Sequence, residues 1–156
     1  MALPRVLGRA GVTMLEMAVV LALAAILLSV GSSTLTGYNQ RTAARSAAEV
    51  FSRDLMLARA ISLRGREVVT VKFNEAARSY TVVTASGREL ASRRFDGTGD
   101  LTLSSVDLAL TGDSIAFSGR GVGSLSASVG LARFQAGTVT YQVQFNPMAS
   151  SKVSRL

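Results

Sequence analysis

The stretch RAGVTMLEMAVVLALAAI, residues 9–26, places one carboxylate, Glu16, within a run of apolar side chains. The run continues to Val30, and no Lys, Arg or His lies between Val12 and Val30. At about 1.5 Å per residue, a helix over residues 12–30 is roughly 28 Å long, close to the roughly 30 Å thickness of a bilayer's hydrocarbon core. A charge within such a run usually marks a function and needs a partner of opposite charge. We therefore expect a chain terminus or another molecule to supply the partner of Glu16.

Three interpretations of this N-terminus compete. It is a secretory signal peptide with a small-x-small cleavage site at residues 22–24, or it is a plain membrane anchor. Neither of these gives Glu16 a role. In the third interpretation, the chain is cleaved between Gly11 and Val12, so that Glu16 becomes the fifth residue of the mature protein. Its carboxylate then pairs with the new α-amino group of a neighbouring subunit.

A resemblance to a known family favours the third interpretation. Residues 9–26 resemble the class III signal of type IV pilins and type II secretion pseudopilins, in which Gly and the cleavage point are followed by a hydrophobic residue, Thr, two apolar residues and Glu. Val12 stands where the family most often has Phe, and Met14 where it often has Leu, and both keep an apolar side chain. The resemblance implies that prepilin peptidase cleaves after Gly11 and that the amine of Val12 is methylated.

The same resemblance implies an organisation for the chain. Residues 1–11 are expected to be the prepilin leader, residues 12–34 the half of the first helix that lies in the membrane and later in the filament core, and residues 35–156 an exported globular domain. The protein is expected in the inner membrane, single-pass with a periplasmic C-terminal domain, before it assembles into a pilus or pseudopilus. Its implied partners are other pilin or pseudopilin subunits, prepilin peptidase and the inner membrane.

An amphipathic helical pattern continues after Val30. Small and apolar residues recur at intervals of three and four between charged ones. They are Ala44, Ala47, Ala48, Phe51, Leu55, Ala58 and Ser62. We expect one long helix over residues 13–64, with Gly65 in the left-handed conformation that closes the last turn. Gly31 and Gly37 weaken the helix, so a bend or local melting is expected near them.

Beyond Gly65 the hydrophobic period changes from 3.6 to 2, which predicts strands. They are expected at residues 67–73, 79–84, 88–95, 114–118 and 138–145, the first three forming an antiparallel meander. The segment 119–137 is interpreted as loop plus one or two strands. The helix is the available cover for the sheet's apolar face. The predicted fold class is therefore α+β and pilin-like, a long N-terminal helix whose second half packs on an antiparallel sheet within residues 66–146.

Within the superfamily, the stretch IAFSGRGVGS, residues 115–124, is similar to the GspH/FimT branch of minor pilins and pseudopilins. This implies a subunit that primes or caps a type IV pilus or a type II secretion pseudopilus, with Glu16 setting the axial register between subunits. An alternative is DNA binding in natural transformation, as in some FimT proteins, through a basic C-terminal segment. The candidate residues are Lys152, Arg155, Arg120 and Arg133, although the tail lacks the Gly-Arg-x-Arg pattern of that branch.

The composition argues against an enzyme. The chain has no His and no Cys, and hence no imidazole base, thiol nucleophile or disulfide. Its Asp residues beyond the helix lie in separate turn-like segments and are expected to cap turns, and the spacing within residues 96–100 does not match a calcium loop. No cofactor or metal is expected. The 17 basic residues against 10 acidic ones give a net charge of +7, and most are Arg, which suits contacts with phosphate or carboxylate groups.

Overall fold

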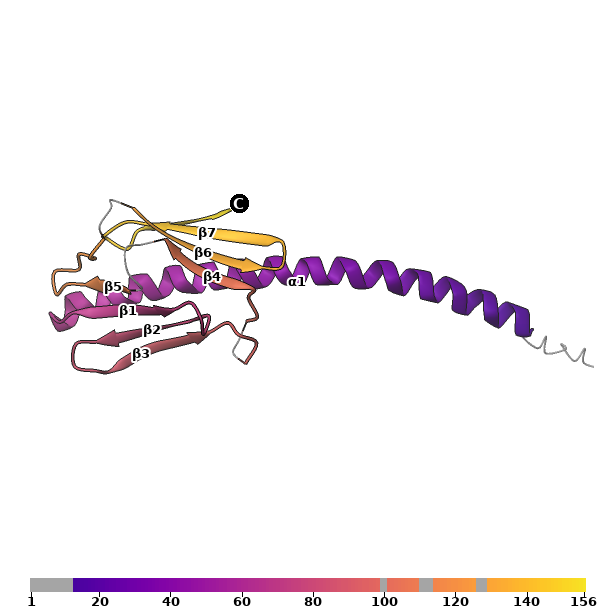
Figure 1. Cartoon of the computed structure of the whole chain (residues 1–156), viewed down its shortest axis with the longest axis horizontal. Coiled ribbons are helices and arrows are strands. Elements are labelled where there is room, and N and C mark those ends of the chain that lie inside the picture. The colour runs from indigo at the N-terminus through magenta and orange to yellow at the C-terminus, as the bar shows by residue number, and fades with distance from the viewer. Residues whose placement is uncertain (1–12, 99–100, 110–113, 126–128) are drawn as a thin grey trace, which may run out of the picture. The chain divides into compact units, whose positions relative to one another are not determined.

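The computed structural model of the chain describes residues 13–98, 101–109, 114–125 and 129–156, without the side chains of residues 30–34 and 109. The chain divides into two compact units, Met1–Gly37 and Tyr38–Leu156. Helix α1 (Met14–Gly65) begins in the first unit and ends in the second (Figure 1). The expected leader and the cleavage point between Gly11 and Val12 lie outside the described residues.

The first unit consists, in its described part, of the start of α1. Its apolar side chains are exposed, with Leu15, Leu21 and Leu28 at 76%, 65% and 74%. Within the described residues, none of the helices is both long and apolar enough to cross a bilayer. The expected span over residues 12–34 extends beyond this description, because Val12 and the side chains of residues 30–34 are outside it.

The second unit contains two antiparallel four-stranded sheets together with the second half of α1. The first sheet has the order β3-β2-β1-β5. Its strands are β1 (Val69–Asn74), β2 (Ser79–Thr84), β3 (Glu89–Arg94) and β5 (Ser114–Phe117). The register pairs Val69 of β1 with both Thr84 and Phe117, so the start of β1 lies beside the end of β2 and the end of β5.

The second sheet has the order β4-β6-β7-β8. Its strands are β4 (Ser105–Ala109), β6 (Gly130–Ala136), β7 (Val139–Phe145) and β8 (Ser151–Arg155). Along β6, residues with buried side chains alternate with partly or fully exposed ones, which is the pattern of a sheet with one face on the core. A hydrogen bond between the hydroxyl groups of Ser52 and Ser151 also ties α1 to β8.

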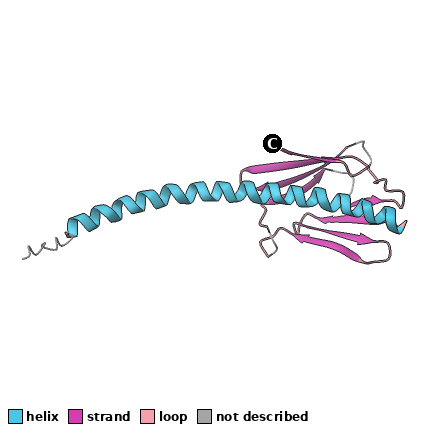
Figure 2. Cartoon of the chain, turned by 180° about the vertical axis from the view of Figure 1, so that it is seen from behind, coloured by secondary structure: helices cyan, strands magenta, loops and turns pink. Residues whose placement is uncertain are grey.

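The second half of α1 covers one face of both sheets, and Figure 2 shows it in front of their strands. Phe51 lies at the centre of this core. Its ring centroid is 5.3 Å from that of Phe73 and 5.5 Å from that of Tyr80 in the first sheet. In the second sheet it is 5.5 Å from Phe134 and 5.8 Å from Phe145. One side chain of the helix therefore packs against both sheets.

The structure confirms the α+β class, the single long helix and the β1-β2-β3 meander. The strand predicted over residues 79–84 has the observed bounds, and the predicted last turn of the helix lies within one residue of the observed end at Gly65. The predicted amphipathic stripe is also confirmed, since its members from Ala44 to Ser62 are all fully buried.

Three details differ from the prediction. The sheet is split in two, and the strands β4 and β8, each of five residues, were not predicted. Strand β8 has one apolar residue, Val153, whereas Val106 and Leu108 alternate in β4, a signal that the sequence analysis missed. The left-handed residue after α1 is Arg66, with φ of 50°, rather than Gly65. The helix runs without interruption past Gly31 and Gly37, so the local melting expected there is wrong.

Candidate functional sites

The first turn of α1 holds Glu16 in a defined backbone position. Thr13 caps the helix, since its hydroxyl oxygen accepts a hydrogen bond from the backbone N–H of Glu16 at 3.2 Å and its carbonyl accepts one from Met17 N–H at 3.2 Å. Thr followed three residues later by Glu is the capping-box pattern, a signal that the sequence analysis did not use. A carboxylate in the first turn also lies favourably in the field of the helix dipole.

The carboxylate of Glu16 is exposed, and no ion pair of Glu16 occurs among the described residues. The hydrogen bond to Thr13 uses the backbone of Glu16 rather than its side chain. The carboxylate therefore retains its capacity to accept hydrogen bonds from a partner.

The surface around Glu16 is apolar on all sides of the helix. Met14, Leu15 and Met17 are 95%, 76% and 51% exposed, and Leu27 and Leu28 are both 74% exposed. A helix that is hydrophobic all round is normally buried, in lipid or among other helices. The start of α1 thus combines a large unburied apolar surface with one carboxylate.

The basic residues proposed for DNA binding are not gathered on one surface. In β8, Lys152 pairs with the exposed Gln144, whereas Arg155 pairs with Tyr141, which lies on the alternate face of β7. Because successive side chains of a strand point to opposite faces, residues three apart such as Lys152 and Arg155 do so as well.

The other two candidates are Arg133, in β6, and Arg120, in the turn after β5. Arg133 of β6 pairs in register with Asp107 of β4, and its guanidinium lies 3.5 Å from the Asp107 carboxylate, which offsets its charge. Arg120 is exposed in the turn that follows β5, which belongs to the other sheet. Arg133 and Lys152 share one face of the second sheet, since Lys152 pairs with Gln144, which pairs with Leu131, two residues before Arg133. Arg155 lies on the other face and Arg120 in the other sheet's turn, so the four residues do not form one surface.

A buried carboxylate that the sequence analysis did not single out ties α1 to the first sheet. Asp54 is 5% exposed and accepts hydrogen bonds from the Tyr80 hydroxyl at 2.9 Å and from Arg93 Nε at 3.0 Å. Burial, reinforced by the Asp54 carboxylate, raises the pKa of the Tyr80 hydroxyl above its ordinary value. The arrangement satisfies every buried polar group in this part of the core and identifies it as structural.

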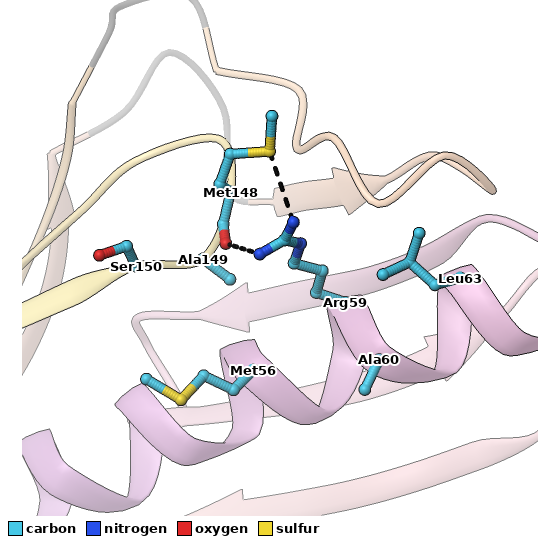
Figure 3. Close-up of a pocket in the computed structure, with 7 residues that line it drawn as sticks. All are labelled: Met56, Arg59, Ala60, Leu63, Met148, Ala149 and Ser150. Atoms are coloured by element: carbon cyan, nitrogen blue, oxygen red, sulfur yellow. Dashed lines mark hydrogen bonds between the residues drawn. The ribbon is translucent and has the colours of Figure 1, made fainter.

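A groove lies along the last turns of α1 (Figure 3). It has a volume of about 460 Å³ and is lined by Met56, Arg59, Ala60, Leu63, Met148, Ala149 and Ser150. The guanidinium of Arg59 crosses it and donates hydrogen bonds to the backbone oxygens of Met148 at 2.6 Å and Gly121 at 3.1 Å. These bonds fix the β7–β8 connection and the turn after β5 against the helix.

The turn after β3 is organised by Asp96, as expected for a turn-capping Asp. Its carboxylate accepts hydrogen bonds from the hydroxyl and the N–H of Thr98, which lower the pKa of Asp96 to about 2. Gly99 and Asp100, which the calcium hypothesis also needs, lie outside the described residues. No group of three or more metal-ligating side chains occurs in the part of the chain that the structure describes.

Two solved structures share this fold. They are two crystal forms of the type IV minor pilin FimU of Pseudomonas aeruginosa strain PAO1. The first has a TM-score of 0.56 at 16% identity, with 75% of this chain and 92% of the FimU chain covered. The second has a TM-score of 0.52 at 17% identity, with 70% and 91% covered. No protein-family model and no curated protein matches the sequence.

The chain therefore has a type IV pilin-like fold, and the predicted resemblance to this superfamily is confirmed at the level of the fold. In that fold the second half of α1 packs on antiparallel sheets, as it does here.

Proposed function

We propose that the chain is a minor pilin, a structural subunit that assembles with other pilin subunits into a type IV pilus. The observation that carries this proposal is the combination of a FimU-like fold with an unburied apolar helix start that bears one carboxylate. A globular unit with its own core does not need this apolar surface in order to fold, whereas a filament made of packed helices would bury it.

The proposed role of Glu16 is to set the register of the subunit within the filament. In an apolar helix bundle, the desolvation of an ion pair offsets most of its attraction, so such a pair specifies geometry more than it adds stability. The proposed partner is the α-amino group of Val12 on a neighbouring subunit, after cleavage at Gly11 by prepilin peptidase and methylation. Before assembly, the proposed location is the inner membrane, with the unit Tyr38–Leu156 on the periplasmic side.

Substitution of Glu16 tests this role cleanly. Glu16→Ala retains the backbone N–H that donates a hydrogen bond to the Thr13 hydroxyl oxygen, so the helix cap remains. We expect Glu16→Ala and Glu16→Lys to remain in the membrane fraction but to be absent from sheared filaments. The matched control is Glu89→Ala, which removes an exposed carboxylate of β3 and should leave the amount in filaments unchanged. Normal incorporation of Glu16→Lys would exclude the proposed ion pair.

The cleavage step has its own test. Intact-mass measurement of the mature chain should give a species that begins at a methylated Val12. Gly11→Arg should retain the leader, because a side chain at the scissile bond prevents the close backbone approach that Gly permits. A mature chain that begins at another residue would remove Val12 as the partner of Glu16.

A pseudopilus of type II secretion is the second candidate assembly, since the class III signal is common to both machines. Purified pili and secreted proteins from a strain that lacks this chain distinguish the two: loss of pili supports the first, and loss of secretion with intact pili supports the second. DNA binding through Lys152 and Arg155 stays a hypothesis, and the separation of these side chains gives it no common surface.

A further inference from the structure

Exposed apolar side chains of the second unit gather at the end of α1. Among the described residues 38–156, nine large hydrophobic residues are exposed, and four of them surround the last turns of the helix. These are Met56, Leu63, Val122 and Met148, with exposed fractions of 50%, 45%, 42% and 47%. Three of the four line the groove of Figure 3. Clustered exposed apolar surface, unlike scattered single residues, marks an interaction site.

The turn after β5 brings Val122 to this groove. A Cβ atom placed on Gly121 would lie 2.7 Å from Cγ of Leu63, so the turn packs directly on the helix and only Gly fits there. Gly121 has φ of 71°, a conformation that Gly adopts without strain. The backbone oxygen of Gly121 also accepts the hydrogen bond from Arg59 Nε. The backbone of Arg120 and Val122, the chain neighbours of Gly121, therefore lies close to Leu63 and Arg59.

Arginines without carboxylate partners surround the apolar side chains. Three of the five N–H groups of Arg59 donate hydrogen bonds, one to the backbone oxygen of Gly121 and two to the backbone oxygen and the sulfur of Met148. The other two N–H groups have no acceptor among the described residues. Arg120 is exposed and takes part in no ion pair of the described chain. Four other arginines, in contrast, each have a carboxylate within 3.5 Å.

Arg66 is a further exposed arginine, and its backbone lies against Gly119, the residue before Arg120. Its φ of 50° places a non-glycine residue in the left-handed region, which costs about 1 kcal/mol or more. The position is fixed by Gly119, where an added Cβ would lie 2.7 Å from the carbonyl carbon and oxygen of Arg66. The pairing of Val69 with Phe117 brings the two segments together.

We propose that Met56, Arg59, Leu63, Arg120, Val122 and Met148, here called the α1-end surface, dock an acidic and apolar face of a second, different subunit. Arg and Met are enriched at the centres of protein interfaces, and Lys is depleted there, which matches this set. Arginines with unused donors form strong, often bidentate hydrogen bonds with carboxylates, so an acidic partner face is complementary to this surface. The inference rests on the proposed function, because a subunit of a filament has neighbours of other kinds.

Two other occupants fit the surface less well. A second copy of this chain that docked through the same surface would bring arginines against arginines, in a chain with a net charge of +7. Nucleic acid requires closely spaced phosphate contacts, and single strands require aromatic rings for stacking. The exposed side chains between the arginines here are instead aliphatic or thioether groups.

The absence of cysteine from the chain allows a direct test. Val122→Cys places one thiol on the α1-end surface, and Thr138→Cys, in the exposed β6–β7 turn, is the control of similar side-chain size. We expect maleimide labelling of the Val122→Cys thiol to be roughly tenfold slower in intact filaments than in detergent-solubilised protein, as in a buried interface, with little change at Thr138→Cys. Equal labelling rates in both states at Val122→Cys, or equal protection of both thiols, would overturn the proposal.

Charge reversal at Arg120 provides a second test of the docking surface. Arg120→Glu should lower the amount of the chain in filaments roughly tenfold, about 1.4 kcal/mol of docking free energy, whereas Lys152→Glu should not. Each variant is used only if its melting temperature equals that of the wild type. If wild-type chain is itself absent from filaments, the proposed function fails; if it is present and Arg120→Glu incorporates normally, the docking surface fails. Duplex DNA binding by the full chain in detergent that Arg120→Glu abolishes would assign the surface to nucleic acid instead.

Discussion

The two halves of α1 share one backbone conformation and have opposite surroundings. In the first half, Leu15, Leu21 and Leu28 are between 65% and 76% exposed, whereas in the second half Phe51 and Leu55 are fully buried. The first half is apolar on all sides, and the second is apolar along one stripe. A stripe is a face for a partner within the same chain, and here two sheets cover it. An all-round apolar surface needs partners on every side, which a single chain of this size does not provide.

The largest expected effect comes from the second half. Phe51→Ala removes a ring that contacts both sheets and should lower the free energy of unfolding by about 3–5 kcal/mol. Leu21→Ala, in the first half, should leave that free energy unchanged because Leu21 is 65% exposed and is not a member of the buried core. Urea unfolding of the detergent-solubilised chain, followed by tyrosine fluorescence, measures both. Similar losses of unfolding free energy for the two variants would show that the two halves of α1 do not differ in their contribution to stability.

Asp54→Ala should have the next largest effect on the free energy of unfolding. It leaves the buried Tyr80 hydroxyl and the partly exposed Arg93 without their acceptor, at a cost of about 2–3 kcal/mol. The control is Asp107→Ala, whose carboxylate is 50% exposed and pairs with Arg133 at 3.5 Å. That change should cost less than about 1 kcal/mol. An equal cost for the two changes would show that burial of the carboxylate does not matter.

The same network predicts a dependence on pH. Because the pKa of Tyr80 is raised in the folded protein, the folded state keeps a proton that the unfolded chain releases above about pH 10. The contribution of Tyr80 is therefore complete below that pH and is lost as the pH rises, by up to about 1.4 kcal/mol per unit. Urea unfolding from pH 9 to 11 should show a smaller loss for Tyr80→Phe than for the wild type. Identical pH profiles would place the Tyr80 hydroxyl in contact with water.

The smallest effect is expected at the start of the helix. Thr13→Val keeps the shape of the side chain and removes the oxygen that accepts the Glu16 N–H, at a local cost of about 1 kcal/mol. Hydrogen exchange of the Glu16 amide should accelerate about fivefold, while the unfolding of the second unit stays the same. Unchanged exchange would show that the cap does not hold this turn. A change in global unfolding would show instead that the two halves of α1 unfold together.

Much of the fold could be predicted from local pattern. The strands over residues 79–84 and 139–145 carry alternating apolar residues that identify them, and the stripe from Ala44 to Ser62 identifies the helix face. Strand β8 has Val153 as its one apolar residue, and it forms because β7 offers it an open edge. Local propensity carries no information about such an edge, since it exists only after the rest of the sheet has formed.

The candidate sites also divide into features that the local sequence determines and features that depend on tertiary structure. The sequence by itself determined the apolar helix, the lone carboxylate of Glu16 and the Thr that caps its turn, because all three depend on residues within one or two helical turns. Tertiary structure alone decided that Lys152 and Arg155 lie on opposite faces of a sheet, that Asp54 is buried beside Tyr80, and that Arg59 joins two distant turns into a groove. Asp54 and Arg59 are placed by contacts between α1 and segments far apart in the chain, and the faces of Lys152 and Arg155 depend on β8 forming against β7, none of which hydrophobic periodicity encodes.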